Sequence, residues 1–385
     1  MGLMSIGKYS NFIIQISVGF SIGAVIACSP TKFESANTTS GGCISSGAST
    51  CVVINSYEHR EEPFKVGAGK VDILFVDDNS ASMSFEQKEM AARFGAFVEN
   101  LDAREIDYRI AVITTDLAAT QSKRFITFAN GKSFLSNLDS NRVGMFNQAI
   151  ARPETLACEN FIRGAINNYG PQWRSDDRYQ SGYYINCPSP DEQGIATASL
   201  VLSENTESFV RADANLSIIV ISDENEHAGR STSFIDMMNT TYPTKYWDFN
   251  SIIVRDNSCK NIQSNQIKDQ QNVSAVGAAI GSEYAAISAS AAKDIDNNPR
   301  PRGQWLNICQ SNYTQHFTTI ATSISEAARS YPLSCQPSEP PTVERVSNSN
   351  QTVPYTWDGN QRIVFQRGSE GIPVKVKYRC YKGPA

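Results

Sequence analysis

The fold class is decided by residues 70–82, which read KVDILFVDDNSAS. Residues 70–76 are mostly apolar, and several of them are β-branched. Such a run, without regular alternation of polar and apolar side chains, is typical of a strand that is buried on both faces of a parallel sheet. We therefore predict a buried parallel strand that ends at a group of aspartate and serine residues.

Helical and strand patterns alternate along the chain after this stretch. From Ser84 to Leu101 large apolar residues recur at helical spacing, and Ser84 and Gln87 have the spacing of a capping box. Strands that alternate with helices predict an α/β fold, here a doubly wound, mostly parallel sheet flanked by helices. Further helices are predicted at 155–167, 191–204 and 311–330, and further buried strands at 108–114, 216–221 and 251–254.

The composition limits the class of protein. The 385 residues include 34 basic and 39 acidic side chains, for a net charge of −5, and 41% are hydrophobic. This is the composition of a globular protein, and it excludes a chain that is disordered throughout or that crosses a membrane many times. A mildly acidic chain lacks the basic footprint of nucleic-acid binding, so we expect no nucleic acid as a partner. Three histidines leave little room for a histidine-rich metal site.

The sequence divides into four segments. In the last of them, apolar and basic residues alternate over 374–380, which predicts an antiparallel strand with one solvated face, and 362–365 is its expected partner. The basic stripe of this strand could bind acidic polymers, but we interpret it as a solvated face. The segments are a signal peptide at 1–27, a Ser/Thr/Gly-rich tether at 28–65, the α/β domain at 66–335 and a small β-rich C-terminal appendage at 336–385.

The first segment has the pattern of an exported lipoprotein. Lys8 is its only charge, and residues 11–27 are mostly apolar or small. Val25-Ile26-Ala27-Cys28 resembles the lipobox of bacterial lipoproteins, which implies cleavage before Cys28 and a membrane anchor of lipid on that cysteine. Ser29 then implies the outer membrane, so we expect a protein of the bacterial cell envelope on its periplasmic or surface face. A plain signal peptide or a short anchor helix is the alternative.

Eight cysteines remain once Cys28 carries a lipid. An even number in an exported chain predicts disulfides, and sequential pairing would close four local loops. No C-x-x-C motif is present, so neither a zinc ribbon nor a thioredoxin motif is supported. The disulfide candidates are Cys43, Cys51, Cys158, Cys187, Cys259, Cys309, Cys335 and Cys380.

Three of the predicted strands end in acidic and hydroxyl residues. The first runs into Asp78, the second into Thr115 and Asp116, and the third into Asp223 and Glu224. Ligand sites of open α/β sheets lie beyond the carboxyl ends of the strands, so these side chains are expected to converge. Ligands that are all oxygen select a hard cation such as Mg²⁺, Mn²⁺ or Ca²⁺.

The spacing Asp78-x-Ser80-x-Ser82 after a buried strand resembles the D-x-S-x-S motif of the von Willebrand factor A (VWA) family. Asp223 resembles that family's second signature, and together these residues resemble its metal-ion-dependent adhesion site (MIDAS). The resemblance covers residues 70–335, and DEQGIA at 191–196 is similar to a stretch that heads a helix in exported bacterial members. It implies a divalent cation held directly by the serine hydroxyls, with Mg²⁺ preferred and Mn²⁺ or Ca²⁺ as alternatives. It also implies a protein partner whose carboxylate fills an open position on the ion.

The third hydroxyl ligand of the family has no counterpart in a loop of the expected type. Ser189, just before the predicted helix 191–204, is our first candidate, and Thr115 is the second. Nearby, residues 168–190 are rich in Tyr and Trp and are bracketed by Cys158 and Cys187. Exposed aromatic residues are typical interface anchors, so this loop is either a rim that selects the partner or a hydrophobic cluster packed over the sheet.

These patterns predict a lipid-anchored envelope protein that recognises a protein partner through a divalent cation, in adhesion or envelope assembly. Catalysis is not expected, because no nucleophile is placed beside a general base, and Asp116 and Glu224 are the candidate bases. The alternative is a metal-free envelope scaffold or assembly protein that keeps only the VWA fold.

Overall fold

The computed structural model describes residues 50–54, 57–188, 192–271, 278–293, 299–310, 313–357, 359 and 361–382. The predicted signal peptide, the lipidation site Cys28 and the candidate ligand Ser189 lie outside these residues. The chain divides into two units, Met1–Gly41 and Gly42–Ala385, and every helix and strand named below belongs to the second.

A six-stranded sheet forms the centre of the larger part of this unit. Its strands are β3 (Lys70–Asp77), β4 (Asp107–Thr114), β5 (Phe134–Ser136), β6 (Asn215–Ser222), β7 (Trp247–Ile253) and β10 (Trp305–Asn307). They lie in the order β10-β7-β6-β3-β4-β5, and every neighbouring pair is parallel except β4 and β5. The prediction of a mostly parallel α/β sheet is confirmed.

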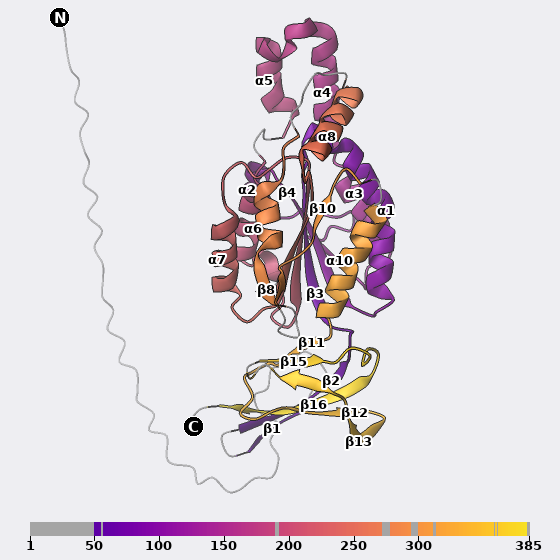
Figure 1. Ribbon diagram of the computed structural model, residues 1–385, viewed down its shortest axis with the longest axis vertical. Coiled ribbons are helices and arrows are strands. Elements are labelled where there is room, and N and C mark those ends of the chain that lie inside the picture. The colour runs from indigo at the N-terminus through magenta and orange to yellow at the C-terminus, as the bar shows by residue number, and fades with distance from the viewer. Residues whose placement is uncertain are drawn as a thin grey trace, which may run out of the picture. The chain divides into compact units, whose positions relative to one another are not determined.

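Helices cover both faces of this sheet (Figure 1). They are α1 (Ser84–Asp102), α2 (Leu117–Ser122), α3 (Arg142–Ile150), α4 (Pro153–Tyr169), α5 (Asp177–Asn186), α6 (Gly194–Ser203), α7 (Ser231–Thr241), α8 (Asn257–Gln271), α9 (Ser282–Ala289) and α10 (Tyr313–Ala327), with short 3₁₀ turns η1 (Ala81–Met83), η2 (Gly170–Ser175) and η3 (Thr206–Ser208). In β3, Ile73 and Phe75 enter the core shared with α1 and α10, whereas Leu74 and Val76 enter the opposite core shared with α6 and α7. Both faces of β3 are therefore buried, which explains why its sequence shows no alternation.

The remaining strands form antiparallel sheets. A five-stranded sheet has the order β1-β2-β16-β12-β13, with β1 (Thr50–Ile54), β2 (Tyr57–Lys65), β16 (Pro373–Tyr381), β12 (Thr342–Arg345) and β13 (Asn348–Thr352). A three-stranded sheet joins β11 (Ser330–Pro332), β15 (Arg362–Phe365) and β14 (Tyr355–Trp357), and β8 (Ala291–Lys293) pairs with β9 (Pro299–Pro301).

Two sequence-based expectations differ from this arrangement. The predicted pairing of 374–380 with 362–365 is wrong, because β16 pairs with β2 and β12, while β15 pairs with β11 and β14. The other difference is at the end of the predicted tether 28–65, where β2 is a strand of the C-terminal sheet and pairs with β16 along its whole length. Apolar alternation could not reveal β2, since its sequence YEHREEPFK is dominated by charged residues.

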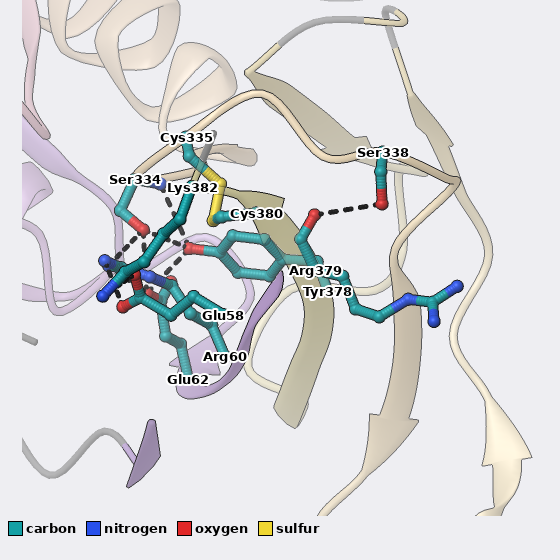
Figure 2. Close-up of a disulfide and its surroundings, with 10 residues drawn as sticks. All are labelled: Glu58, Arg60, Glu62, Ser334, Cys335, Ser338, Tyr378, Arg379, Cys380 and Lys382. Carbon is teal, nitrogen blue, oxygen red and sulfur yellow. Dashed lines mark hydrogen bonds and ion pairs between the residues drawn. A yellow bond between two sulfur atoms is a disulfide. The ribbon is translucent and has the colours of Figure 1, made fainter. Parts of the chain in front are cut away.

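The charged residues of β2 are held by polar contacts within the strand and with β16. Glu62 is buried and accepts a hydrogen bond of 2.7 Å from the Tyr378 hydroxyl of β16, as Figure 2 shows. Arg60 pairs with Glu58 at 2.7 Å and lies 3.8 Å from Glu62. Buried charges are tolerated only when they are paired in this way. On one side β2 pairs with β1, its neighbour in sequence, but its other partner, β16, comes from the far end of the chain, which explains why no local pattern predicts that pairing.

The basic stripe of β16 is matched by acidic residues. Lys377 pairs with Glu344 at 2.8 Å, Lys375 pairs with Glu61, and Arg379 pairs with Glu339. These pairs are partly exposed, so each contributes little to stability. Their geometry fits a solvated face rather than a binding surface for acidic polymers.

Three of the four predicted disulfides are confirmed: Cys158–Cys187, Cys259–Cys309 and Cys335–Cys380. The last one ties β16 to the segment that follows β11. Cys43 and the side chain of Cys51 lie outside the described residues. No helix in the described part of the chain has the length and apolar character needed to cross a membrane.

Candidate metal centre

The D-x-S-x-S residues gather in the turn between β3 and α1. The backbone N–H of Ser80 donates to Asp78 Oδ1 at 2.8 Å, and the hydroxyls of Ser80 and Ser82 are 2.9 Å apart. Ser82 Oγ donates to Asp223 Oδ1 at 3.1 Å, across 141 positions of sequence. Four predicted ligand residues, Asp78, Ser80, Ser82 and Asp223, are thus linked in one chain of hydrogen bonds.

The sheet register brings these residues together. β3 and β6 are parallel neighbours with Asp77 opposite Ile221, so both strands end at the same level. The backbone N–H of Asp78 continues this pairing by donating to the Ile221 carbonyl at 3.1 Å. Ser222 Oγ then donates to Asp78 Oδ2 at 2.7 Å, which fixes the second oxygen of that carboxylate. Ser222 is a site residue that motif spacing alone did not identify.

Thr115 reaches the cluster through a glutamate. It follows β4, the other neighbour of β3, and its backbone N–H donates to the Asp77 carbonyl at 3.3 Å. Its side chain is buried and donates to the carboxyl group of Glu192, whose pKa is raised by burial and by the nearby charge of Asp78. Glu192 lies just before α6 and was not predicted as a site residue. It belongs to the stretch 191–196, whose resemblance to exported bacterial VWA proteins was the only sign of it in the sequence.

The electrostatics of the site are those of crowded, buried acids. Burial, followed by the charges of Asp78 and Glu224, raises the pKa of Asp223 well above its usual range. The same causes act on the pKa of Glu192, and burial followed by Asp78 raises the pKa of Glu224 to about 8. Burial also raises the pKa of Asp78, against the hydrogen bonds from Ser222 and Ser80. A bound cation would relieve this repulsion.

The donor set fits a hard cation. Asp223 Oδ2 is buried and has no hydrogen-bond partner among the described residues, so it has a free lone pair beside the serine hydroxyls. No group of three His, Cys, Asp or Glu side chains in the described ranges is arranged to hold a metal ion. A cation here would therefore depend on the neutral oxygens of Ser80 and Ser82, as the D-x-S-x-S resemblance implies. Such an all-oxygen set suits Mg²⁺, Mn²⁺ or Ca²⁺.

Gln87 of α1 supports the turn between β3 and α1 through side-chain hydrogen bonds. The predicted capping box is wrong, because α1 begins at Ser84 without a side-chain cap. Instead, buried Gln87 donates through Nε2 to the Asp78 carbonyl at 2.9 Å and to Asp77 Oδ2 at 3.3 Å. Its neighbour Thr155 of α4 donates to the Asn79 carbonyl at 2.8 Å. The Asp78 and Asn79 carbonyls of the loop thus accept hydrogen bonds from side chains of α1 and α4.

Replacing Gln87 by leucine is expected to lower the free energy of unfolding by about 1–3 kcal/mol, because the buried Asp78 carbonyl loses its donor. Urea denaturation in the presence of a chelator measures this change. The exposed Gln121 on α2 supplies a matched control, and Gln121→Leu should stay within about 0.5 kcal/mol of the wild type. Equal stability of the two variants would contradict a supporting role for Gln87.

The aromatic residues of the stretch 168–190 divide into two groups. Trp173 is buried and packs with Cys158, Ile162 and Ala165, and Tyr169, Tyr179 and Tyr183 pack against this cluster. Tyr184 is 78% exposed and its neighbour Ile185 is 83% exposed. The interpretation as a packed hydrophobic cluster therefore describes most of these aromatic residues, while Tyr184 remains on the surface.

Comparisons with known proteins show weak likeness. No protein-family model and no curated protein matches the sequence. Among solved structures, the chain is similar to the pilus adhesin SpaC from Lactobacillus rhamnosus GG in its open conformation, with 10% identity over 86% of this chain and 42% of that one, at a TM-score of 0.32. It is similar to proximal thread matrix protein 1 from the mussel byssus, with 12% identity over 70% of this chain and 48% of that one, at a TM-score of 0.27. It is also similar to the manganese-loaded TRAP protein of Plasmodium vivax, with 9% identity over 85% of this chain and 98% of that one, at a TM-score of 0.30.

This chain covers 42% of the adhesin and 48% of the byssus protein, which is less than half of each. Likenesses at these identities and TM-scores carry no argument about function. The case for a function therefore rests on the residues of the site.

Proposed function

We propose that this chain is a lipid-anchored protein of the bacterial cell envelope whose VWA-like domain binds a protein partner through a divalent cation. The observation that carries the proposal is the meeting of Ser80, Ser82 and Asp223 beside Asp78 at the end of the parallel sheet. Mg²⁺ is the proposed ion, and a carboxylate of the partner would complete its coordination. Thr115 or Ser189 would supply a further oxygen.

The proposed role is recognition rather than catalysis. Apart from Asp223 Oδ2, the oxygens of Ser80, Ser82 and Asp223 hydrogen-bond with one another, and Asp78, Asp223 and Glu192 are buried. This arrangement suits holding an ion more than activating a nucleophile. Adhesion and envelope assembly are the two settings in which such recognition would serve. The anchor at Cys28 is proposed on its sequence resemblance alone.

Calorimetric titration of the folded protein with Mg²⁺, Mn²⁺ and Ca²⁺ tests the proposal. The wild type is expected to bind at least one of these ions, and Ser82→Ala is expected to weaken binding by about tenfold or more, since changes around a metal site cost about 10–100-fold in affinity. Ser122→Ala, at an exposed serine of α2, should bind as the wild type does.

A folded wild type that binds none of the three ions, even with acetate added to supply a carboxylate, would refute the proposal. The second candidate function, a metal-free scaffold that keeps only the fold, would then be favoured. No observation in the site favours that candidate at present, because it leaves buried Asp223 Oδ2 without a partner among the described residues.

A further inference from the structure

Helix α5 differs from the other long helices in what it buries. None of its ten residues is buried, and its sequence over 179–186, YQSGYYIN, carries no charge. Tyr184 and Ile185 are among the most exposed large apolar side chains of the described residues, at 78% and 83%. Figure 1 shows α4 and α5 extending beyond the end of the central sheet that lies opposite β11. Tyr179 and Tyr183 of α5 pack against the cluster around Trp173, whereas Tyr184 and Ile185 face solvent.

The excursion formed by α4, η2 and α5 is fixed to the candidate metal loop. Ala81 of that loop is buried in the same hydrophobic cluster as Cys158, Ile162 and Trp173. The Thr155 hydroxyl of α4 holds the Asn79 carbonyl. The Cys158–Cys187 disulfide closes the excursion, and the chain then returns toward Glu192. The exposed residues of α5 therefore belong to a segment that is restrained by a disulfide and by packing against the candidate metal loop.

The excursion also lies near the acidic cluster. Burial, then Tyr179, then the charges of Glu192, Glu224 and Asp78 raise the pKa of Tyr183, so the Tyr183 hydroxyl lies within electrostatic reach of the site. Tyr184 packs edge-on against Tyr183, with ring centroids 6.2 Å apart. The exposed Tyr184 is thus in ring contact with a tyrosine whose pKa responds to the charges of the acidic centre.

Building on the proposed function, we infer that the exposed face of α5 around Tyr184 and Ile185 is a docking surface for the protein partner. The partner would present an acidic side chain to the cation and a large apolar side chain, close to it in sequence, to α5. Exposed aromatic and aliphatic anchors next to a polar centre are what protein interfaces use to gain affinity, and charged residues are depleted from the core of such interfaces. A rigid, disulfide-closed support limits the entropy that binding would cost.

A phage-displayed library of random peptides, selected on the full chain in Mg²⁺ and eluted with a chelator, provides the probe. Enriched peptides are expected to combine Asp or Glu with a nearby large apolar residue. The affinity of the best synthetic peptide is expected to fall at least tenfold in the double variant Tyr184→Ser/Ile185→Ser. The Mg²⁺ affinity and the circular dichroism spectrum of this variant should match those of the wild type.

Leu138→Ser is the matched control. Leu138 is 89% exposed and follows β5, which pairs with the first half of β4, away from Thr115. This variant should bind the peptide as the wild type does.

Three results would overturn the assignment of α5 while Mg²⁺ binding stays normal. The first is an unchanged peptide affinity in the double variant, and the second is a set of enriched peptides that lack the acidic and apolar pair. The third is a double variant that loses binding to phospholipid vesicles but keeps its peptide affinity, which would mean that α5 contacts a membrane. Failure of the proposed function is distinguishable, because the wild type itself would then not bind Mg²⁺.

Discussion

Replacing Asp78 by alanine is expected to abolish the stabilisation of this protein by divalent cations. At a cation concentration 100 times the dissociation constant, the wild type should gain about 2.7 kcal/mol in free energy of unfolding, and the variant should gain nothing. The reason is that Asp78 orders the turn through the Ser80 N–H and the Ser222 hydroxyl and adds charge beside the serine oxygens. Urea denaturation with chelator and with excess Mg²⁺ measures the difference for each protein.

The control is Asp116→Asn, which removes a carboxylate next to Thr115. Asp116 caps α2 by accepting from the Ala119 N–H at 3.0 Å, and asparagine preserves that cap. This variant should keep the full Mg²⁺ effect. A cation effect that persists in Asp78→Ala would place the ion elsewhere. An Asp78→Ala protein that is unfolded by circular dichroism would show that Asp78 serves the fold rather than an ion alone.

The second large effect is expected in the pH dependence of stability. Without a cation, the protein should lose stability as the pH rises from about 5 to about 8. A carboxyl group whose pKa is raised in the folded state favours folding when protonated, and this contribution disappears as the pH passes the folded pKa. Glu224, with its pKa raised to about 8, and Asp223 and Glu192, raised well above their usual range, all act in this direction.

A bound cation should reverse this loss, because it favours the charged carboxylates. The stabilisation by Mg²⁺ is therefore expected to grow by about 1–3 kcal/mol between pH 5 and pH 8. Asp72 and Asp248 also have raised pKa values, each about 6, so the difference between Mg²⁺ and chelator is the quantity to compare rather than either curve alone. Urea denaturation at three pH values measures it, with Glu224→Gln expected to flatten the curve in chelator.

A Mg²⁺ effect that is the same at pH 5 and pH 8 would contradict the proposal that these acids surround the ion. An increase that survives in Asp78→Ala would separate the pH dependence from the candidate metal centre.

The sequence alone predicted the four longest strands of the central sheet and the position of the candidate metal centre, whereas β5, β10 and the strand order came only from the structure. Residues 70–76 are apolar without alternation because successive side chains enter the two cores on opposite faces of β3. Asp78 and Asp223 meet because each follows a buried strand, and parallel neighbours end at the same edge of a sheet. Three disulfides were predictable because their loops are local in sequence.

Only the tertiary structure decided the features that depend on distant partners. β2 joins β16 although its sequence has no apolar alternation, since Tyr378, more than 300 positions away, satisfies its buried Glu62. Gln87 donates to the Asp78 carbonyl instead of capping α1, and Thr115 donates to Glu192, 77 positions further along the chain. Local periodicity records which face of an element is buried. The partner of a buried polar group is fixed by the packing of elements that lie far apart in the chain, and no local pattern encodes it.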